Sequence, residues 1–271
     1  MDTKTSKQTL TDVQLLLLLA AARLLFHVLT NNQYGFHRDA LAFLDNGQHL
    51  AWGYVAYPPL TPFVGRVGLE LFGLSLVGIK SLAALAQCVA MVFAGLMAKE
   101  LGGGRGAQLV TAVAAGISLM SLLMSTLFQY ISFDYLWWVL AMYAFIRLLK
   151  SGNPRWWLGL GAAFGLGMMT KYTIVFLITA VVLTVLFFPQ LRAHLKSPWL
   201  WGGVGLSLLI FLPNLIWQVQ NNLVSLEFLT AIRARDVALG RTEGYLAQQL
   251  YVNLNPITVP LFLLGVYFYL G

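Results

Sequence analysis

Three ionisable residues stand out by their positions along the chain. Asp39 follows the first long apolar run of the chain. Asp134 is the only acidic residue in the range 101–226, and Lys171 is the only charged residue in the range 156–190. An ionisable group at a membrane boundary is a functional candidate, because burial without a partner is costly. A solitary cation such as Lys171 is suited to holding an anionic group, for example a lipid phosphate.

Each of the three has a structural alternative. Asp39 would be a loop aspartate that is satisfied by Arg38 or by a helix N-terminus. Asp134 lies among aromatic residues and would cap the start of a helix. Lys171 would anchor its segment by extending its amine to the membrane surface. The residues alone leave these alternatives open.

Other polar and small residues favour packing roles. Arg23 and His27 are four positions apart, so they share one face of a helix, and we expect them to face the bundle instead of lipid. Gly161 and Gly165 have the spacing of a small-residue helix contact. The single Cys88 lies in an apolar run and offers neither a disulfide nor a cysteine metal site.

Proline and glycine mark two turns. Tyr57-Pro58-Pro59-Leu60 predicts a rigid, extended corner, because proline fixes its own φ and restrains the preceding residue. The alternative is a simple loop brace. The glycines in the range 102–106 follow no strand and lack the Lys-Ser/Thr pair of a phosphate loop, so they predict a tight turn.

The composition is that of a membrane protein. Hydrophobic residues make up 59% of the 271 residues and charged residues only 10%, with a mean hydropathy of +0.74. Soluble domains carry about 25% charged residues. The net charge of +7 comes from scattered Lys and Arg, which argues against nucleic-acid binding and fits charges that set membrane orientation.

Apolar runs predict an all-α, polytopic transmembrane helix bundle of about eight spans. We treat 1–271 as a single transmembrane domain, with a long first outer loop at 31–80 that carries juxtamembrane helices. The first run lacks a small-residue cleavage site, so we expect a retained span and not a signal peptide. The predicted spans are 13–29, 82–98, 109–128, 135–149, 157–169, 173–188, 200–217 and 257–270.

Positive charge predicts a cytoplasmic N-terminus. With that orientation the short outer turns carry almost no positive charge apart from Lys171, as the positive-inside rule requires. Both long polar loops then lie outside, so the non-cytoplasmic face carries the elaborated loops. The inner segments hold Lys4, Lys7, Lys99, Arg105, Arg147, Lys150, Arg155, Arg192 and Lys196.

A series of motifs resembles the membrane part of the GT-C glycosyltransferases of family 39. That group is similar to protein O-mannosyltransferases and lipid A aminoarabinose transferases. The resemblance covers roughly residues 34–228. In order, the motifs are Asp39 and the Pro-Pro-Leu corner, Phe133-Asp-Tyr-Leu-Trp-Trp138, Thr170-Lys-Tyr-Thr173, Ser197-Pro-Trp-Leu-Trp201 and Leu212-Pro-Asn-Leu-Ile-Trp-Gln218.

The resemblance implies transfer of a sugar from a polyprenyl-phosphate donor to an acceptor hydroxyl at the non-cytoplasmic face. Asp39 matches the family's general base, and Lys171 matches the residue that stabilises the leaving phosphate. Asp134 and Arg38 would position the substrate or Asp39. We therefore predict Asp39 as catalytic and the following residues as substrate-binding: His37, Arg38, Tyr57, Pro58, Pro59, Asp134 and Lys171.

The implied partners are a polyprenyl-phosphate sugar, a lipid or glycan acceptor and membrane lipids, without nucleic acid. No cofactor or metal ligand set is indicated, although a divalent metal is compatible with the residues. We expect an integral protein of the bacterial plasma (inner) membrane.

Two features depart from the family pattern. Ala40 follows Asp39 where the family usually has Glu, and the chain has fewer spans than family members, so we expect a shortened GT-C module. These departures leave open the alternative that the protein is a non-catalytic or degenerate family member that acts as a binding subunit. A transporter or flippase is the other alternative, although no inverted repeat of broken hydrophobic segments is found. An enzyme requires Asp39 and Lys171 to share one cavity, whereas a transporter requires access from both sides.

Overall fold

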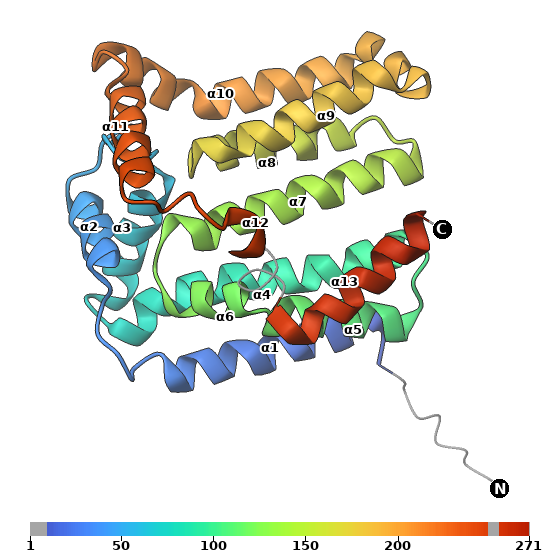
Figure 1. Ribbon diagram of the computed structural model, residues 1–271, viewed down its shortest axis with the longest axis horizontal. Helices are drawn as coiled ribbons and strands as arrows, with labels where there is room; N and C mark the ends of the chain where they lie inside the picture. The colour runs from blue at the N-terminus through green and yellow to red at the C-terminus, as the bar shows by residue number, and fades with distance from the viewer. Residues whose placement is uncertain (1–9, 249–254, 271) are drawn as a thin grey trace, which may run out of the picture.

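The protein is an all-helical bundle in the computed structural model, which describes residues 10–248 and 255–270 (Figure 1). No strand occurs within these ranges. Four helices are long and apolar enough to cross a membrane: α1 (Asp12–Thr30), α4 (Leu76–Glu100), α7 (Tyr130–Ser151) and α10 (Pro198–Gln220). This confirms the predicted helical membrane protein.

Two further spans are broken by sharp bends. α5 (Arg105–Ile117) and α6 (Leu119–Thr126) meet at 59° around Ser118, whose side chain caps α6 by accepting from the Ser121 N–H. The second bend follows α9 (Val175–Phe187), which is preceded by the 3-10 turn η1 (Tyr172–Ile174). Together they form one apolar segment, which meets the 3-10 helix η2 (Pro189–Lys196) at 106°. Counting each pair as one span gives up to six spans by length and composition.

The remaining predicted spans form shorter apolar helices. α8 (Trp156–Met168) and α13 (Asn255–Leu270) occupy the fifth and eighth predicted positions. The predicted tight turn between α4 and α5 is confirmed, with Gly102 at φ +95°, a conformation that favours glycine.

Short helices gather at one end of the bundle. Residues 31–80 hold α2 (Arg38–Gln48) and α3 (Leu60–Phe72), as the sequence predicted. Figure 1 shows α11 (Val224–Ala238) at the same end, lying across the direction of the long helices. Helix α12 (Tyr245–Gln248) follows it in the chain. The polar loops therefore meet at one end of the bundle.

Arg23 joins three spans inside the bundle. Its guanidinium donates to the Gln87 carbonyl on α4 at 3.1 Å, and to the Ser121 and Ser125 hydroxyls on α6 at 2.8 Å each. His27, one turn further along α1, is 1% exposed. Both residues face the bundle, as predicted. Lipid offers no hydrogen bonds, so these partners offset part of the cost of placing Arg23 there, although its Nε has no partner among the described residues.

Two glycines allow α8 and α10 to pack closely together. A Cβ added to Gly161 would lie 2.1 Å from the Gly203 carbonyl oxygen, and one added to Gly203 would lie 2.2 Å from the Trp157 oxygen. Gly165 packs against Ile210 in the same interface. Small residues allow this approach of two backbones, which confirms the packing role predicted for Gly161 and Gly165.

We expect Gly161→Ala to destabilise the protein by about 1–3 kcal/mol, because its methyl group would force α8 and α10 apart. Thermal unfolding of the purified protein in detergent measures the effect. Gly205→Ala on α10 is the matched control, since nothing lies within 4 Å of its added Cβ. Equal unfolding temperatures for the two variants would contradict the close packing.

Candidate functional site

A cluster of aromatic side chains forms the floor of the candidate site. Phe43 of α2 lies 4.4 Å from the Tyr57 ring and 5.7 Å from the Tyr130 ring, measured between centroids. Phe43 and Phe128 are almost fully buried. The cluster fixes α2, the corner before α3 and the start of α7 relative to one another, and the ionisable residues lie around it.

Asp39 lies in the first turn of α2 and is about half exposed. Its Oδ1 is 3.3 Å from Arg38 Nε, and its Oδ2 accepts from Gln129 Nε2 at 3.0 Å. His37 is the N-cap of α2, and its Nδ1 accepts from the Asp39 N–H at 3.2 Å. The structure therefore brings His37, Arg38 and Asp39 together.

Lys171 reaches the same floor from the turn after α8. Its Nζ lies 4.8 Å from the centroid of the Tyr130 ring, within the range of a cation–π contact. The turn is attached to the corner before α3, because the Leu60 N–H donates to the Met169 carbonyl at 2.9 Å. The hydroxyl of Thr170, which lies between Met169 and Lys171 in the sequence, accepts from Trp137 Nε1 of α7 at 2.8 Å. These contacts hold the amine over the aromatic floor.

Asp134 is buried in the second turn of α7 and is 9% exposed. The interpretation of Asp134 as a helix cap is wrong, because α7 begins earlier and its N-cap is Gln129. One carboxylate oxygen accepts from Thr173 at 3.4 Å, and the other has no hydrogen-bond partner in the described structure. Asp134 and Lys171 attract each other electrostatically, without an ion pair within 4 Å among the described residues.

The predicted corner is held by hydrogen bonds and burial. The Tyr57 hydroxyl accepts from Asn46 Nδ2 at 2.7 Å, and Pro59 is the N-cap of α3. Burial raises the pKa of Tyr57, and the nearby Asp39 carboxylate raises it further. Pro58 and Pro59 are buried, which fits a brace for this corner. Substrate contact by the two prolines stays a prediction.

A second polar network joins the loop before this corner to α10. The Tyr172 hydroxyl donates to Asn214 Oδ1 at 2.9 Å and accepts from Gln218 Nε2 at 2.8 Å. Asn214 Nδ2 donates to the Trp52 carbonyl at 2.7 Å. A Cβ on Gly53 would lie 2.2 Å from the Trp217 ring, so the loop packs directly on the helix.

Sequence analysis did not single out Gln129 and Tyr130 as site residues. Gln129 contacts Asp39, and Tyr130 contacts Lys171, so two consecutive residues lie between the two predicted groups. Their signal in the sequence is a polar–aromatic pair at the start of an apolar span, which many membrane helices share. Only the tertiary structure shows which ionisable groups they meet.

Within residues 10–248 and 255–270, no group of three His, Cys, Asp or Glu side chains is placed to hold a metal ion. The described site residues thus offer carboxylate, amine, imidazole and phenol groups around an aromatic floor. This set can accept a proton at Asp39 and bind an anion at Lys171.

Comparisons with known proteins identify a family. Residues 56–217, more than half of the chain, match the family described as dolichyl-phosphate-mannose-protein mannosyltransferase. The chain is 27% identical over 192 residues to the lipid A galacturonosyltransferase RgtD of Rhizobium johnstonii, covering 66% of this chain. The match spans 39% of that relative's length. No solved structure matches the chain.

We expect Asn214→Leu to loosen the loop before α3, because it leaves the Trp52 carbonyl and the Tyr172 hydroxyl without this partner. Losing a buried hydrogen-bond partner costs about 1–3 kcal/mol. Amide hydrogen exchange in residues 50–57 should become faster than in the unmodified protein. Asn221→Leu is the control, since the Asn221 side-chain amide donates to the Trp217 carbonyl of the preceding helical turn and does not contact the loop before α3 through a described hydrogen bond. Equal exchange in both variants would contradict the role of Asn214.

Proposed function

The chain belongs to the dolichyl-phosphate-mannose-protein mannosyltransferase family, and from this premise we propose that it is a membrane glycosyltransferase. It transfers a sugar from a polyprenyl-phosphate donor to an acceptor hydroxyl at the non-cytoplasmic membrane face, with Asp39 as general base. The relative's name, lipid A galacturonosyltransferase, favours a lipid-anchored acceptor.

The observation that carries this proposal is the position of Asp39 and Lys171 around one aromatic floor. Gln129 holds the carboxylate, and the next residue, Tyr130, lies under the amine. The two groups come from helix α2 and from the turn after α8, which are far apart in sequence. A base and an anion-binding cation at one site are what displacement of a phosphate by a hydroxyl requires.

The proposed reaction is a single displacement at the anomeric carbon. Asp39 takes the proton of the acceptor hydroxyl as its oxygen forms the new bond to that carbon. The bond between the anomeric carbon and the phosphate oxygen breaks, and polyprenyl phosphate leaves with the bonding electrons. Lys171 stabilises the charge that develops on the phosphate, while Asp134 helps to keep the amine in place.

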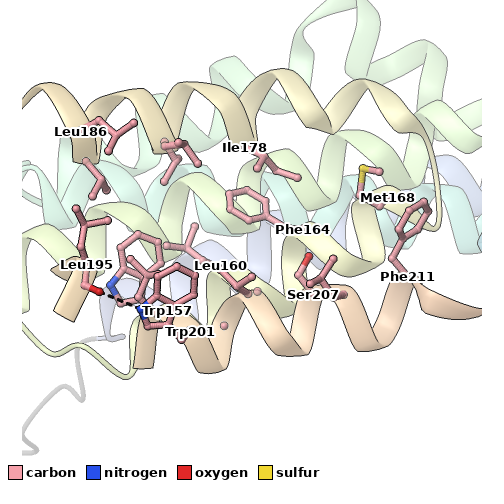
Figure 2. A pocket seen from close by; sticks show the side chains of 18 of the residues that line it. Trp157, Leu160, Phe164, Met168, Ile178, Leu186, Leu195, Trp201, Ser207 and Phe211 are labelled. Carbon is pink, nitrogen blue, oxygen red and sulfur yellow. Dashed lines mark hydrogen bonds between the residues drawn. The ribbon is translucent and has the colours of Figure 1, made fainter. Parts of the chain in front are cut away.

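An apolar groove supports a donor with a long hydrocarbon tail. It has a volume of about 470 Å³ and lies between α8, α9, η2 and α10 (Figure 2). Met168 and Phe211 lie at one end of the groove, and Trp157 and Trp201 lie toward the other. The centroid of the Phe211 ring lies 6.2 Å from that of Tyr172, which is the sequence neighbour of Lys171. A tail in the groove would therefore start close to the proposed phosphate position.

We expect Asp39→Asn to lower sugar transfer by at least about a hundredfold, because general base catalysis contributes roughly 10²–10⁴-fold. The assay uses membranes, with a panel of radiolabelled polyprenyl-phosphate sugars. Asp45→Asn removes an exposed carboxylate from the same helix and should leave transfer unchanged. Undiminished transfer by Asp39→Asn at equal expression would exclude Asp39 as the base.

We expect Lys171→Gln to lower kcat/KM for the same donor by about a hundredfold, because removing one donor to a developing oxyanion costs about 10²–10³ in kcat. Lys171→Arg should retain part of the activity, since its charge is kept. Lys150→Gln, at the exposed C-terminal end of α7, is the matched control. A Lys171→Gln variant with wild-type kinetics would remove the phosphate-binding role.

A further inference from the structure

Gln129 makes the most specific contact to Asp39 in the described structure. Its Nε2 donates to Asp39 Oδ2 at 3.0 Å and lies 3.3 Å from His37 Nδ1. Gln129 is 8% exposed, whereas Arg38, which lies near the other carboxylate oxygen, has 89% of its side chain exposed. The buried amide is therefore the better fixed of the two.

The backbone around Gln129 is itself well anchored. Its carbonyl accepts from the Ser132 N–H at 3.1 Å as α7 begins. Ser132 is fully buried and donates its hydroxyl to the Met124 carbonyl at 2.8 Å. The preceding Phe128 is fully buried in the aromatic cluster. An amide on such a support can hold a carboxylate in one rotamer.

The hydrogen bonds give the two carboxylate oxygens different roles. The Asp39 N–H donates to His37 Nδ1, so this nitrogen carries no hydrogen and its 3.7 Å contact with Oδ2 is not a hydrogen bond. The Oδ2 oxygen is held by Gln129. Among the described contacts, the Oδ1 oxygen meets the exposed Arg38, whose Nε lies 3.3 Å away, and no buried donor holds it.

We infer that Gln129 is a positioning residue, which holds Asp39 Oδ2 so that Oδ1 faces the acceptor hydroxyl. The inference rests on the proposed function, because it assigns Gln129 a part in that reaction. Gln129 acts through Asp39 and does not itself take up the proton.

Ala40 shows why this task falls to a residue of another helix. Its side chain is 2% exposed and packs in the cluster that contains Phe43 and Phe128. Position 40 thus faces apolar side chains and provides no polar group beside Asp39. The amide from the start of α7 supplies the hydrogen bond instead.

The charged and titratable groups around Asp39 come from several parts of the chain. His37 and Arg38 precede it on its own segment, Tyr57 lies on the corner before α3, and Tyr130 lies on α7. Lys171 and Asp134 also lie near the Tyr130 ring. The described hydrogen-bond and ion-pair partners of the Asp39 carboxylate include no second carboxyl group. A carboxylate introduced at position 129 would therefore be a new type of neighbour for Asp39.

Two variants test the inference by activity. Gln129→Leu should lower kcat about ten- to a hundredfold with KM nearly unchanged, because the base loses its orientation. Gln129→Glu should move the acidic limb of the pH–rate profile upward by about one pH unit or more, because adjacent carboxylates disfavour each other's ionised form. Gln48→Glu adds the same charge at the exposed end of α2 and should leave the profile unchanged.

A stability cycle tests the pairing without any assay of transfer. At pH 8, Gln129→Glu should lower the thermal unfolding temperature through repulsion between two carboxylates. Adding Asp39→Asn should restore it, because the asparagine amide can donate to the new glutamate.

The outcomes separate the two proposals. Wild-type transfer with an unchanged pH profile in Gln129→Glu, or no recovery in the double variant, would overturn the role of Gln129. Absence of transfer by the wild type with every donor, together with recovery in the double variant, would instead overturn the proposed function, and the positioning role with it.

Discussion

Hydrocarbon provides no hydrogen bonds, and this constraint shapes the whole molecule. A polar group between the long helices is stabilised by a partner on a neighbouring helix. Arg23 finds such partners on α4 and α6, and Gln87 donates to the Ser132 carbonyl at 2.7 Å, whereas both ring nitrogens of the buried His27 have no hydrogen-bond partner among the described residues. Other polar groups collect at the two ends of the bundle, where side chains can stay hydrated. The candidate site lies at the end with α2, α3 and α11, and the ion pairs Arg105–Asp12 and Arg147–Glu100 lie at the opposite end.

The sequence predicted the fold well because an apolar run long enough to cross a bilayer is seldom compatible with anything except a membrane helix. All eight predicted spans contain helices, and Arg23 and Gly161 have the packing roles that their neighbours suggested. The break at Ser118 was not foreseen, since its flanking residues continue the apolar run. Helix ends also shifted. α7 begins at Tyr130, so Asp134 lies inside the helix and not at its cap.

The site was harder to predict because it depends on contacts between distant segments. Asp134 and Lys171 stood out by scarcity of charge, and Asp39 by its position after the first span, which are both visible in a single chain. Gln129 and Tyr130 did not, since their importance comes from what α2 and the turn after α8 bring to them. Polar side chains at helix starts are common, and nothing local separates a cap from a support for a base.

The network from Asn214 to the Trp52 carbonyl has a consequence for biosynthesis. Its two ends are 162 residues apart in the chain. At about 5–20 residues per second, a ribosome takes roughly 10–30 s to cover that distance. During this interval the loop before α3 lacks its anchor on α10, although α1 and α4 are already made. The loop beside the candidate site is thus anchored late, and a nascent chain stopped before α10 would carry Asp39 without this attachment of the loop before α3.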